Sequence, residues 1–120
     1  MLLKIWIPGK IVPKARPRVT RNGTFMPPRY REWREAAEFE ILSQLAKVDT
    51  PIAFPVAITM EFRGKHRATV DIDNAAGAVL DALVASNVLT DDRLKFIPKL
   101  ILEHLPSFKD VGIFIEINSI

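Results

Sequence analysis

The chain has 120 residues, of which 48% are hydrophobic and 26% charged, with a net charge of +3 and no cysteine. This length and composition indicate one globular domain, residues 1–120, with a core of its own. They exclude disulfides, thiolate nucleophiles and Cys-ligated zinc, and no apolar run approaches the roughly 20 residues that span a bilayer. We therefore expect no membrane partner and a cytoplasmic location.

A strand at residues 3–7 is predicted by alternating apolar residues, and a long irregular arm follows at about residues 8–28. Within this arm the Asn22-Gly23 pair favours a small hairpin. Residues 1–34 hold nine Lys or Arg and one acid, whereas the remainder holds eight basic and thirteen acidic residues. Such cations either solubilise a loop or bind a phosphate backbone, and Pro13 and Pro17 stiffen the segment in a way that favours phosphate binding. The predicted DNA-binding residues, including two from a second basic loop, are Lys10, Lys14, Arg16, Arg18, Arg21, Lys65 and Arg67.

The next elements follow from their apolar periods. An i, i+4 ladder, flanked by Ala36 and Leu42, predicts an amphipathic helix within residues 29–47, and the ladder comprises Trp33, Ala37, Ile41 and Leu45. Strict alternation predicts a strand at 56–62, and a helical period follows at 75–85. The last two strands, at about 94–105 and 111–117, are interpreted as an antiparallel hairpin. The predicted fold is α/β (α+β): a four-stranded mixed sheet with two helices in the order β-α-β-α-β-β.

Several polar and aromatic residues have weaker interpretations. His66 and His104 lack ligand-like spacing and are expected on the surface or in a strand. Tyr30 and Phe25 are candidates for stacking on bases, whereas Trp33 belongs to the apolar face of its helix. The sequence contains no Gly-rich phosphate loop, GxSxG or HExxH motif, so we expect no nucleotide cofactor.

Two aspartates, Asp71 and Asp73, stand where the chain enters the second helix. If the chain is extended there, both carboxylates project to the same side, and Asp73 also suits a helix N-cap. Asp91 and Asp92 lie in the loop before the third strand of the sheet, and that loop returns them to the first pair if the strand lies beside residues 56–62. Crowded carboxylates repel unless a cation neutralises them, and such oxygen ligands suit Mg²⁺. The alternatives are a cap, an ion pair with the neighbouring basic loop and a solvated turn.

The combination of DIDN at 71–74, AVLDAL at 78–83 and Asp91-Asp92 resembles the RusA family of Holliday-junction resolvases, which are small bacterial and phage endodeoxyribonucleases. The similarity extends over essentially the whole chain, including KARPRVTRNGTFMPPRYREW at 14–33. It implies a mixed α/β fold, a homodimer, Mg²⁺ or Mn²⁺ as cofactor, and paired nicks in four-way DNA junctions. By position, it implies that Asp71, Asp73 and Asp92 are catalytic metal ligands and that Asp91 is an adjacent ligand.

One position departs from the family pattern. The family usually has a lysine four residues after the second aspartate, and this chain has Gly77. Close helix packing is a structural explanation for the glycine, and Lys65, Arg67 and Lys95 are candidate substitutes for the missing cation. The leading hypothesis is a Mg²⁺-dependent crossover junction endodeoxyribonuclease acting in DNA recombination and repair. The alternatives are a catalytically weak junction-binding protein of the same fold and a module whose acids only cap and solubilise.

Overall fold

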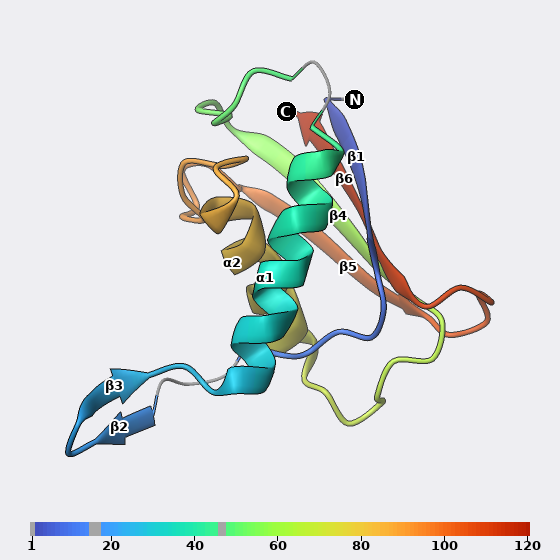
Figure 1. Ribbon diagram of the computed structural model, residues 1–120. Coiled ribbons are helices and arrows are strands. Elements are labelled where there is room, and N and C mark those ends of the chain that lie inside the picture. Colours follow the sequence, from blue (N-terminus) through green and yellow to red (C-terminus); the bar gives the residue numbers. More distant parts are fainter. Residues whose placement is uncertain (1, 15–17, 46–47) are drawn as a thin grey trace.

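The computed structural model describes residues 2–14, 18–45 and 48–120. Within these ranges lie six strands and two helices (Figure 1). Their bounds are β1 (Leu3–Pro8), β2 (Arg18–Thr20), β3 (Gly23–Phe25), α1 (Pro28–Ser43), β4 (Val56–Arg63), α2 (Ile72–Ala85), β5 (Lys99–Leu105) and β6 (Gly112–Ser119).

The main sheet has four strands in the order β1-β6-β4-β5, which confirms the predicted mixed sheet with two helices. Strand β6 is antiparallel to both β1 and β4, whereas β5 is parallel to β4 and forms an edge. The predicted hairpin between the last two strands is therefore wrong. The two inner strands, β6 and β4, each bury three apolar side chains completely, whereas the charged residues Lys99 and Glu103 of β5 remain exposed at the edge.

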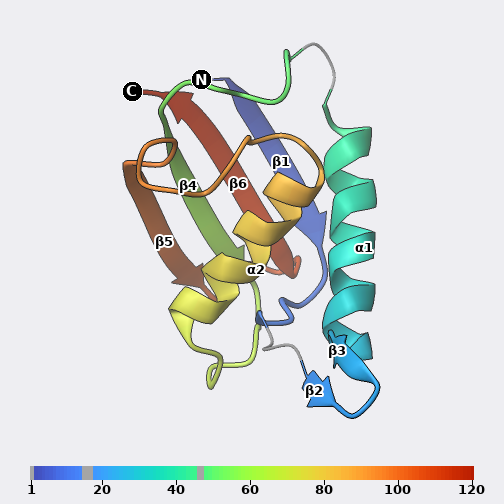
Figure 2. The ribbon, with the colours of Figure 1, turned by 90° about the vertical axis from the view of Figure 1, so that its left-hand side faces the viewer.

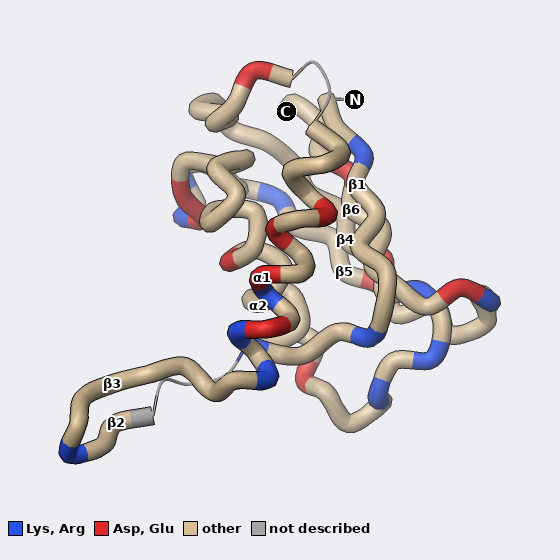
Figure 3. Tube along the Cα trace, in the orientation of Figure 1, with Lys and Arg blue, Asp and Glu red and all other residues tan. Residues whose placement is uncertain are grey.

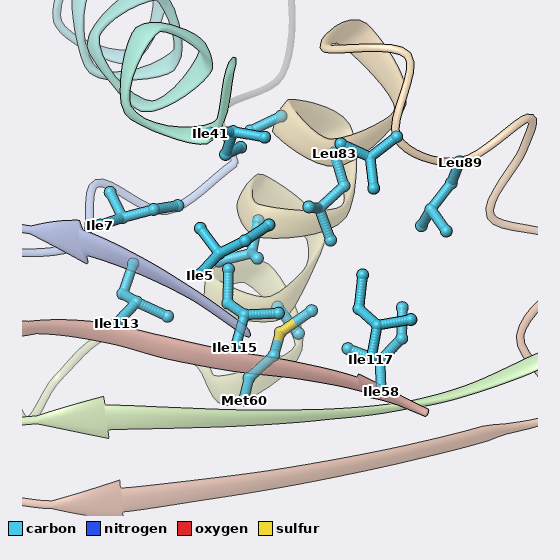
Figure 4. Packing of buried hydrophobic residues seen from close by; sticks show 14 of the residues in the cluster. Ile5, Ile7, Ile41, Ile58, Met60, Leu83, Leu89, Ile113, Ile115 and Ile117 are labelled. Carbon is cyan, nitrogen blue, oxygen red and sulfur yellow. The ribbon is translucent and has the colours of Figure 1, made fainter. Parts of the chain in front are cut away.

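Both helices lie on the same side of the sheet (Figure 2). The core between the layers contains residues from β1, β4, β6, α1 and α2, and Figure 4 shows how they meet. The alternation predicted for β4 is confirmed, because Ile58 and Met60 are fully buried and the intervening Thr59 is not. Each such large side chain contributes about 1.5–3 kcal/mol when it leaves water. This core holds the sheet and the helices in fixed relative positions.

Helix α1 covers the side of the molecule next to β1 and α2. Ala37 and Ile41 of the predicted ladder are buried, but Ala36 and Leu42 are exposed, contrary to the expectation that they flank the apolar face. Tyr30 at the start of α1 is 1% exposed, which excludes its predicted role in stacking on bases. The buried face of α1 is narrow because this helix packs beside the sheet, and only the side of α1 that faces β1 and α2 contacts other elements.

The predicted hairpin in the arm is present as β2 and β3, which form a small sheet of their own. Thr20 pairs with Gly23, so the two turn residues are Arg21 and Asn22, and Gly23 has a φ of 115° that favours glycine. The hairpin extends away from the main body (Figure 1). Among the described residues, neither helix has the length and apolar character needed to cross a membrane.

Candidate active site and nucleic-acid interface

Two exposed carboxylates mark the start of α2. Asp71 is the N-cap residue, with extended backbone angles, and its carbonyl accepts a 3.0 Å hydrogen bond from the Ala75 N–H. Asp73 lies in the first helical turn, where its Oδ1 accepts the Asn74 N–H at 2.9 Å. The chain is thus not extended through Asp73, and the N-cap is Asp71 in place of the suggested Asp73, because the helix already begins at Ile72. Both acids lie at the positive end of the helix dipole, which stabilises negative charge.

The second acidic pair lies in the loop between α2 and β5. Asp91 is held locally, because its Oδ1 accepts the Arg93 N–H at 2.9 Å and its Oδ2 lies 2.7 Å from Arg93 Nε. Asp92 is exposed. Asp92 is therefore the carboxylate of this pair that is more available to an incoming ligand.

The two acidic pairs lie at opposite ends of α2. Because β5 is parallel to β4, the chain leaves β4 at one end of the sheet, returns through α2 and enters β5 at the other end. Backbone contacts place the loop after α2 there: Ile52 N–H donates to the Val88 carbonyl, and Val56 N–H donates to the Phe96 carbonyl. The predicted return of Asp91 and Asp92 to Asp71 within one chain is therefore wrong. The described residues contain no group of three or more acidic or histidine side chains that could hold a metal ion.

The cationic residues of the arm and of the loop after β4 lie at the same end of the molecule as the start of α2 (Figure 3). The Ile11 N–H donates to His66 Nδ1 at 3.0 Å, and the Lys14 N–H donates to the Asn74 carbonyl at 3.0 Å. These bonds fix the arm against both the loop and the helix. Exposed basic residues here are Lys10, Lys14, Lys65 and Arg67.

The other predicted DNA-binding residues belong to the arm near the hairpin. Arg21 is exposed at the turn between β2 and β3. Arg16 lies outside the described residues, and only the backbone of Arg18 is described. Phe25, the remaining candidate for base stacking, is 45% exposed on β3.

His66 is buried, which corrects its prediction as a surface or strand residue. Its Nδ1 accepts the Ile11 N–H, so the ring proton resides on Nε2, which donates to the Gly112 carbonyl at 3.0 Å. The imidazole thereby connects the arm, the loop after β4 and the start of β6. Its role is structural, and it positions the arm beside the candidate site.

A polar contact that the sequence reasoning missed lies in the middle of α2. The buried Tyr30 hydroxyl donates a 2.8 Å hydrogen bond to Asp81 Oδ2, and Lys14 Nζ lies 3.4 Å from Asp81 Oδ1. Burial raises the pKa of the Tyr30 phenol, and the bond to Asp81 raises it further. The signal that could have found this contact is an aspartate inside the otherwise apolar run AVLDAL.

Gly77 faces the same lysine. A Cβ atom at position 77 would lie 3.3 Å from Lys14 Cδ and 3.7 Å from Lys14 Cβ. The first distance is tighter than an ordinary van der Waals contact. The glycine is therefore covered by a side chain of the arm, and the predicted explanation of close packing between helices does not apply.

The family model for endodeoxyribonuclease RusA matches residues 8–118. The chain belongs to the RusA family. The match spans the arm, both helices and both acidic pairs, and no individual curated protein matches the chain closely enough to serve as a relative. Membership in the RusA family implies a nuclease that resolves Holliday junctions, and nucleases of this kind typically use a divalent metal.

Proposed function

We propose that this RusA-family protein is an endonuclease that requires Mg²⁺ and can use Mn²⁺ in its place. It nicks four-way DNA junctions symmetrically. We propose that it acts in recombination and repair in the cytoplasm. The observation that carries the proposal is the pair of exposed carboxylates, Asp71 and Asp73, at the positive end of α2 beside exposed cations. The carboxylates suit a hard divalent cation, and the cations suit a phosphate backbone.

The cationic residues supply the DNA contacts in this proposal. Lys10 on the arm and Lys65 and Arg67 on the loop after β4 flank the start of α2, and Arg21 lies at the tip of the hairpin. Contacts of this kind go to phosphates, so they position DNA without reading its sequence. Their spread from the body of the protein to the projecting hairpin suits branched DNA, whose arms diverge.

A homodimer is the arrangement that completes the proposed metal site. One chain presents Asp71 and Asp73 at one end of α2 and Asp92 at the other. A two-fold axis with the α2 helices antiparallel brings Asp92 of a second copy to Asp71 and Asp73, and it does so twice by symmetry. Two equivalent sites are also what paired nicks require.

Exposed apolar side chains accompany both acidic pairs. Ile72, between Asp71 and Asp73, is 51% exposed, and Leu94, two residues after Asp92, is 84% exposed. In the proposed dimer, the Leu94 of one copy approaches the Ile72 of the other copy. This contact would exclude water from the rim of the composite site and add apolar burial to the association.

The proposed roles of the residues follow from this geometry. Asp71 and Asp73 of one copy and Asp92 of the second copy hold the cation. Asp91 is a neighbouring ligand that binds the cation more weakly, because its carboxylate is paired with Arg93. The chemistry that a divalent cation supplies is activation of water and neutralisation of charge on the departing oxygen. The N-terminal end of α2 and the basic loop orient the scissile phosphate.

The test is an assay with a synthetic four-way junction, Mg²⁺ and two proteins, the wild type and Asp73→Asn. Symmetric nicks by the wild type that the variant loses, with junction binding retained, support the nuclease. Tight binding without nicks by either protein supports the alternative, a catalytically weak junction-binding protein in which no other residue replaces the lysine absent at position 77. Absence of both binding and cleavage contradicts both functions.

A further inference from the structure

The side chain of Lys14 crosses α2 directly over Gly77. Its backbone N–H is fixed to the Asn74 carbonyl at 3.0 Å, its Cδ lies 3.3 Å from the Cβ position of residue 77, and its Nζ reaches Asp81 at 3.4 Å. Asp73, Gly77 and Asp81 follow one another at i, i+4 and i+8 and therefore share a helix face. The side chain of Lys14, which belongs to the arm, therefore lies along a helix face that has Asp73 at one end and Asp81 at the other.

We propose that Lys14 supplies from the arm the active-site ammonium group that contacts the scissile phosphate, in place of a lysine at position 77. This assignment rests on the proposed nuclease function and goes beyond it, because it names a residue distant in sequence from the carboxylates. The ammonium group neutralises charge on the phosphate while the carboxylates hold the cation.

The structure explains why the lysine is free to act in this way. Its side chain is 48% exposed and its ion pair with Asp81 is a single 3.4 Å contact, so the pair contributes little to stability. The fixed backbone keeps Cβ beside Gly77, and rotation about the side-chain bonds turns Nζ from Asp81 toward the Asp73 end of this helix face. Asp81 therefore holds the Lys14 ammonium group while no DNA is bound, and the second oxygen of Asp81 accepts the hydrogen bond from Tyr30.

The glycine belongs to the same arrangement. A side chain at position 77 would displace the aliphatic part of Lys14, because even a Cβ comes within 3.3 Å of it. A side chain at position 77 therefore requires Lys14 to move from its observed conformation by at least a few tenths of an ångström. The glycine leaves space for the lysine of the arm, and its presence does not imply the loss of a cation.

The experiment compares four proteins: wild type, Lys14→Gln, Gly77→Lys and the double variant. Lys4→Gln, an exposed lysine on β1, is the matched control for the loss of one positive charge. Single-turnover nicking is measured with Mg²⁺ at saturating protein, junction affinity is measured in EDTA, and the Tm reports folding. We expect Lys14→Gln to slow nicking on the order of tenfold or more, while Lys4→Gln does not.

The double variant distinguishes a role at the phosphate from a merely structural ion pair. We expect Gly77→Lys to restore most of the nicking rate in the Lys14→Gln background, because it returns an ammonium group to the same helix face. An ion pair that only tethers the arm to Asp81 would not be rescued in this way, because a lysine at position 77 pairs with Asp81 within α2 and leaves the arm untethered. We also expect Gly77→Lys to lower the Tm more in the wild type than in the Lys14→Gln background, because only in the wild type do two ammonium groups repel each other on this helix face.

The outcomes separate this inference from the proposed function. If the wild type does not nick junctions, both proposals fail. If the wild type nicks them and folded Lys14→Gln does so at the same saturated rate, only the assignment of Lys14 fails. Failure of Gly77→Lys to rescue folded Lys14→Gln, with junction affinity in EDTA unchanged between the two proteins, also overturns it.

Discussion

Asp73 lies in the first turn of α2, and Asp92 lies in the loop beyond the opposite end of the same helix. Between them runs most of α2, whose 14 residues span roughly 21 Å at 1.5 Å per residue. The separation follows from the parallel pairing of β4 and β5, which forces the connecting chain to cross the whole sheet. Carboxylates placed in this way cannot share a cation within one chain, but they can do so across a two-fold axis.

Mixing two inactive variants should restore nicking. In the proposed dimer of Asp73→Asn with Asp92→Asn, one site carries both substitutions and the other carries neither. An equal mixture that exchanges subunits freely should therefore contain about a quarter of its sites intact. The product should be nicked junctions without paired cuts, observed on denaturing gels. If the mixture stays as inactive as each variant, although mixed dimers are demonstrated, the composite site is wrong.

Asp91 and Asp92 should differ in their effects. Asp92→Asn should lower nicking on the order of 100-fold, because it removes a proposed ligand from an exposed position. Asp91→Asn should cost less than tenfold, because Asp91 is occupied by Arg93. Single-turnover rates and Mn²⁺ binding by calorimetry provide the measurements. Equal losses in both variants would contradict the distinction drawn from the Arg93 contacts.

Leu94→Lys should weaken the dimer and, with it, Mn²⁺ binding. Leu94 is 84% exposed and lies beside Asp92, so the substitution leaves the fold intact and places a charge in the proposed interface. Leu42→Lys, on the 58% exposed outer side of α1, is the matched control. Sedimentation should show a larger monomer fraction for the first variant only. Unchanged association of Leu94→Lys would exclude this part of the surface from the interface.

His66→Ala should destabilise the protein and loosen the arm. The variant leaves the buried Ile11 N–H without its acceptor, which costs about 1–3 kcal/mol, and the Tm should fall by roughly 4–12 °C. Junction affinity should fall as well, because Lys10 and Lys14 depend on the position of the arm. His104→Ala, which loses only a 3.3 Å contact with Gly64, should be milder. Calorimetry and binding assays check both effects, and equal Tm values for the two variants would exclude a special role for His66.

The salt dependence of junction binding should show whether the basic loop after β4 contacts DNA phosphates. Each phosphate contact adds about 0.9 to the slope of log affinity against log salt concentration. Replacing Lys65 and Arg67 together by Gln should therefore lower the magnitude of that slope by about 2, with a similar effect on unrelated sequences. Fluorescence anisotropy over a range of salt concentrations measures it. An unchanged slope would remove the loop after β4 from the DNA interface.

Local patterns in the sequence were sufficient to predict most of the elements. The alternation of apolar residues in β4 and their helical period in α2 indicate which side of each element faces the core. Both patterns can be recognised within a few residues. The Asn22-Gly23 pair also predicted the hairpin, because turn chemistry is a local property, although the turn residues are Arg21 and Asn22, one position earlier. The combination of DIDN, AVLDAL and Asp91-Asp92 indicated the RusA family, which the match over residues 8–118 then showed.

Only the tertiary structure decided how these elements are arranged. The position of β6 between β1 and β4 depends on pairing with strands that are distant in the chain, and no local period encodes that choice. Strand pairing in turn places Asp92 away from Asp73. The contact of Lys14 with Gly77 joins residues 63 positions apart in the chain, and a glycine by itself does not show what covers it. The sequence by itself determined which chemical groups the protein carries, whereas long-range packing determined which of those groups meet.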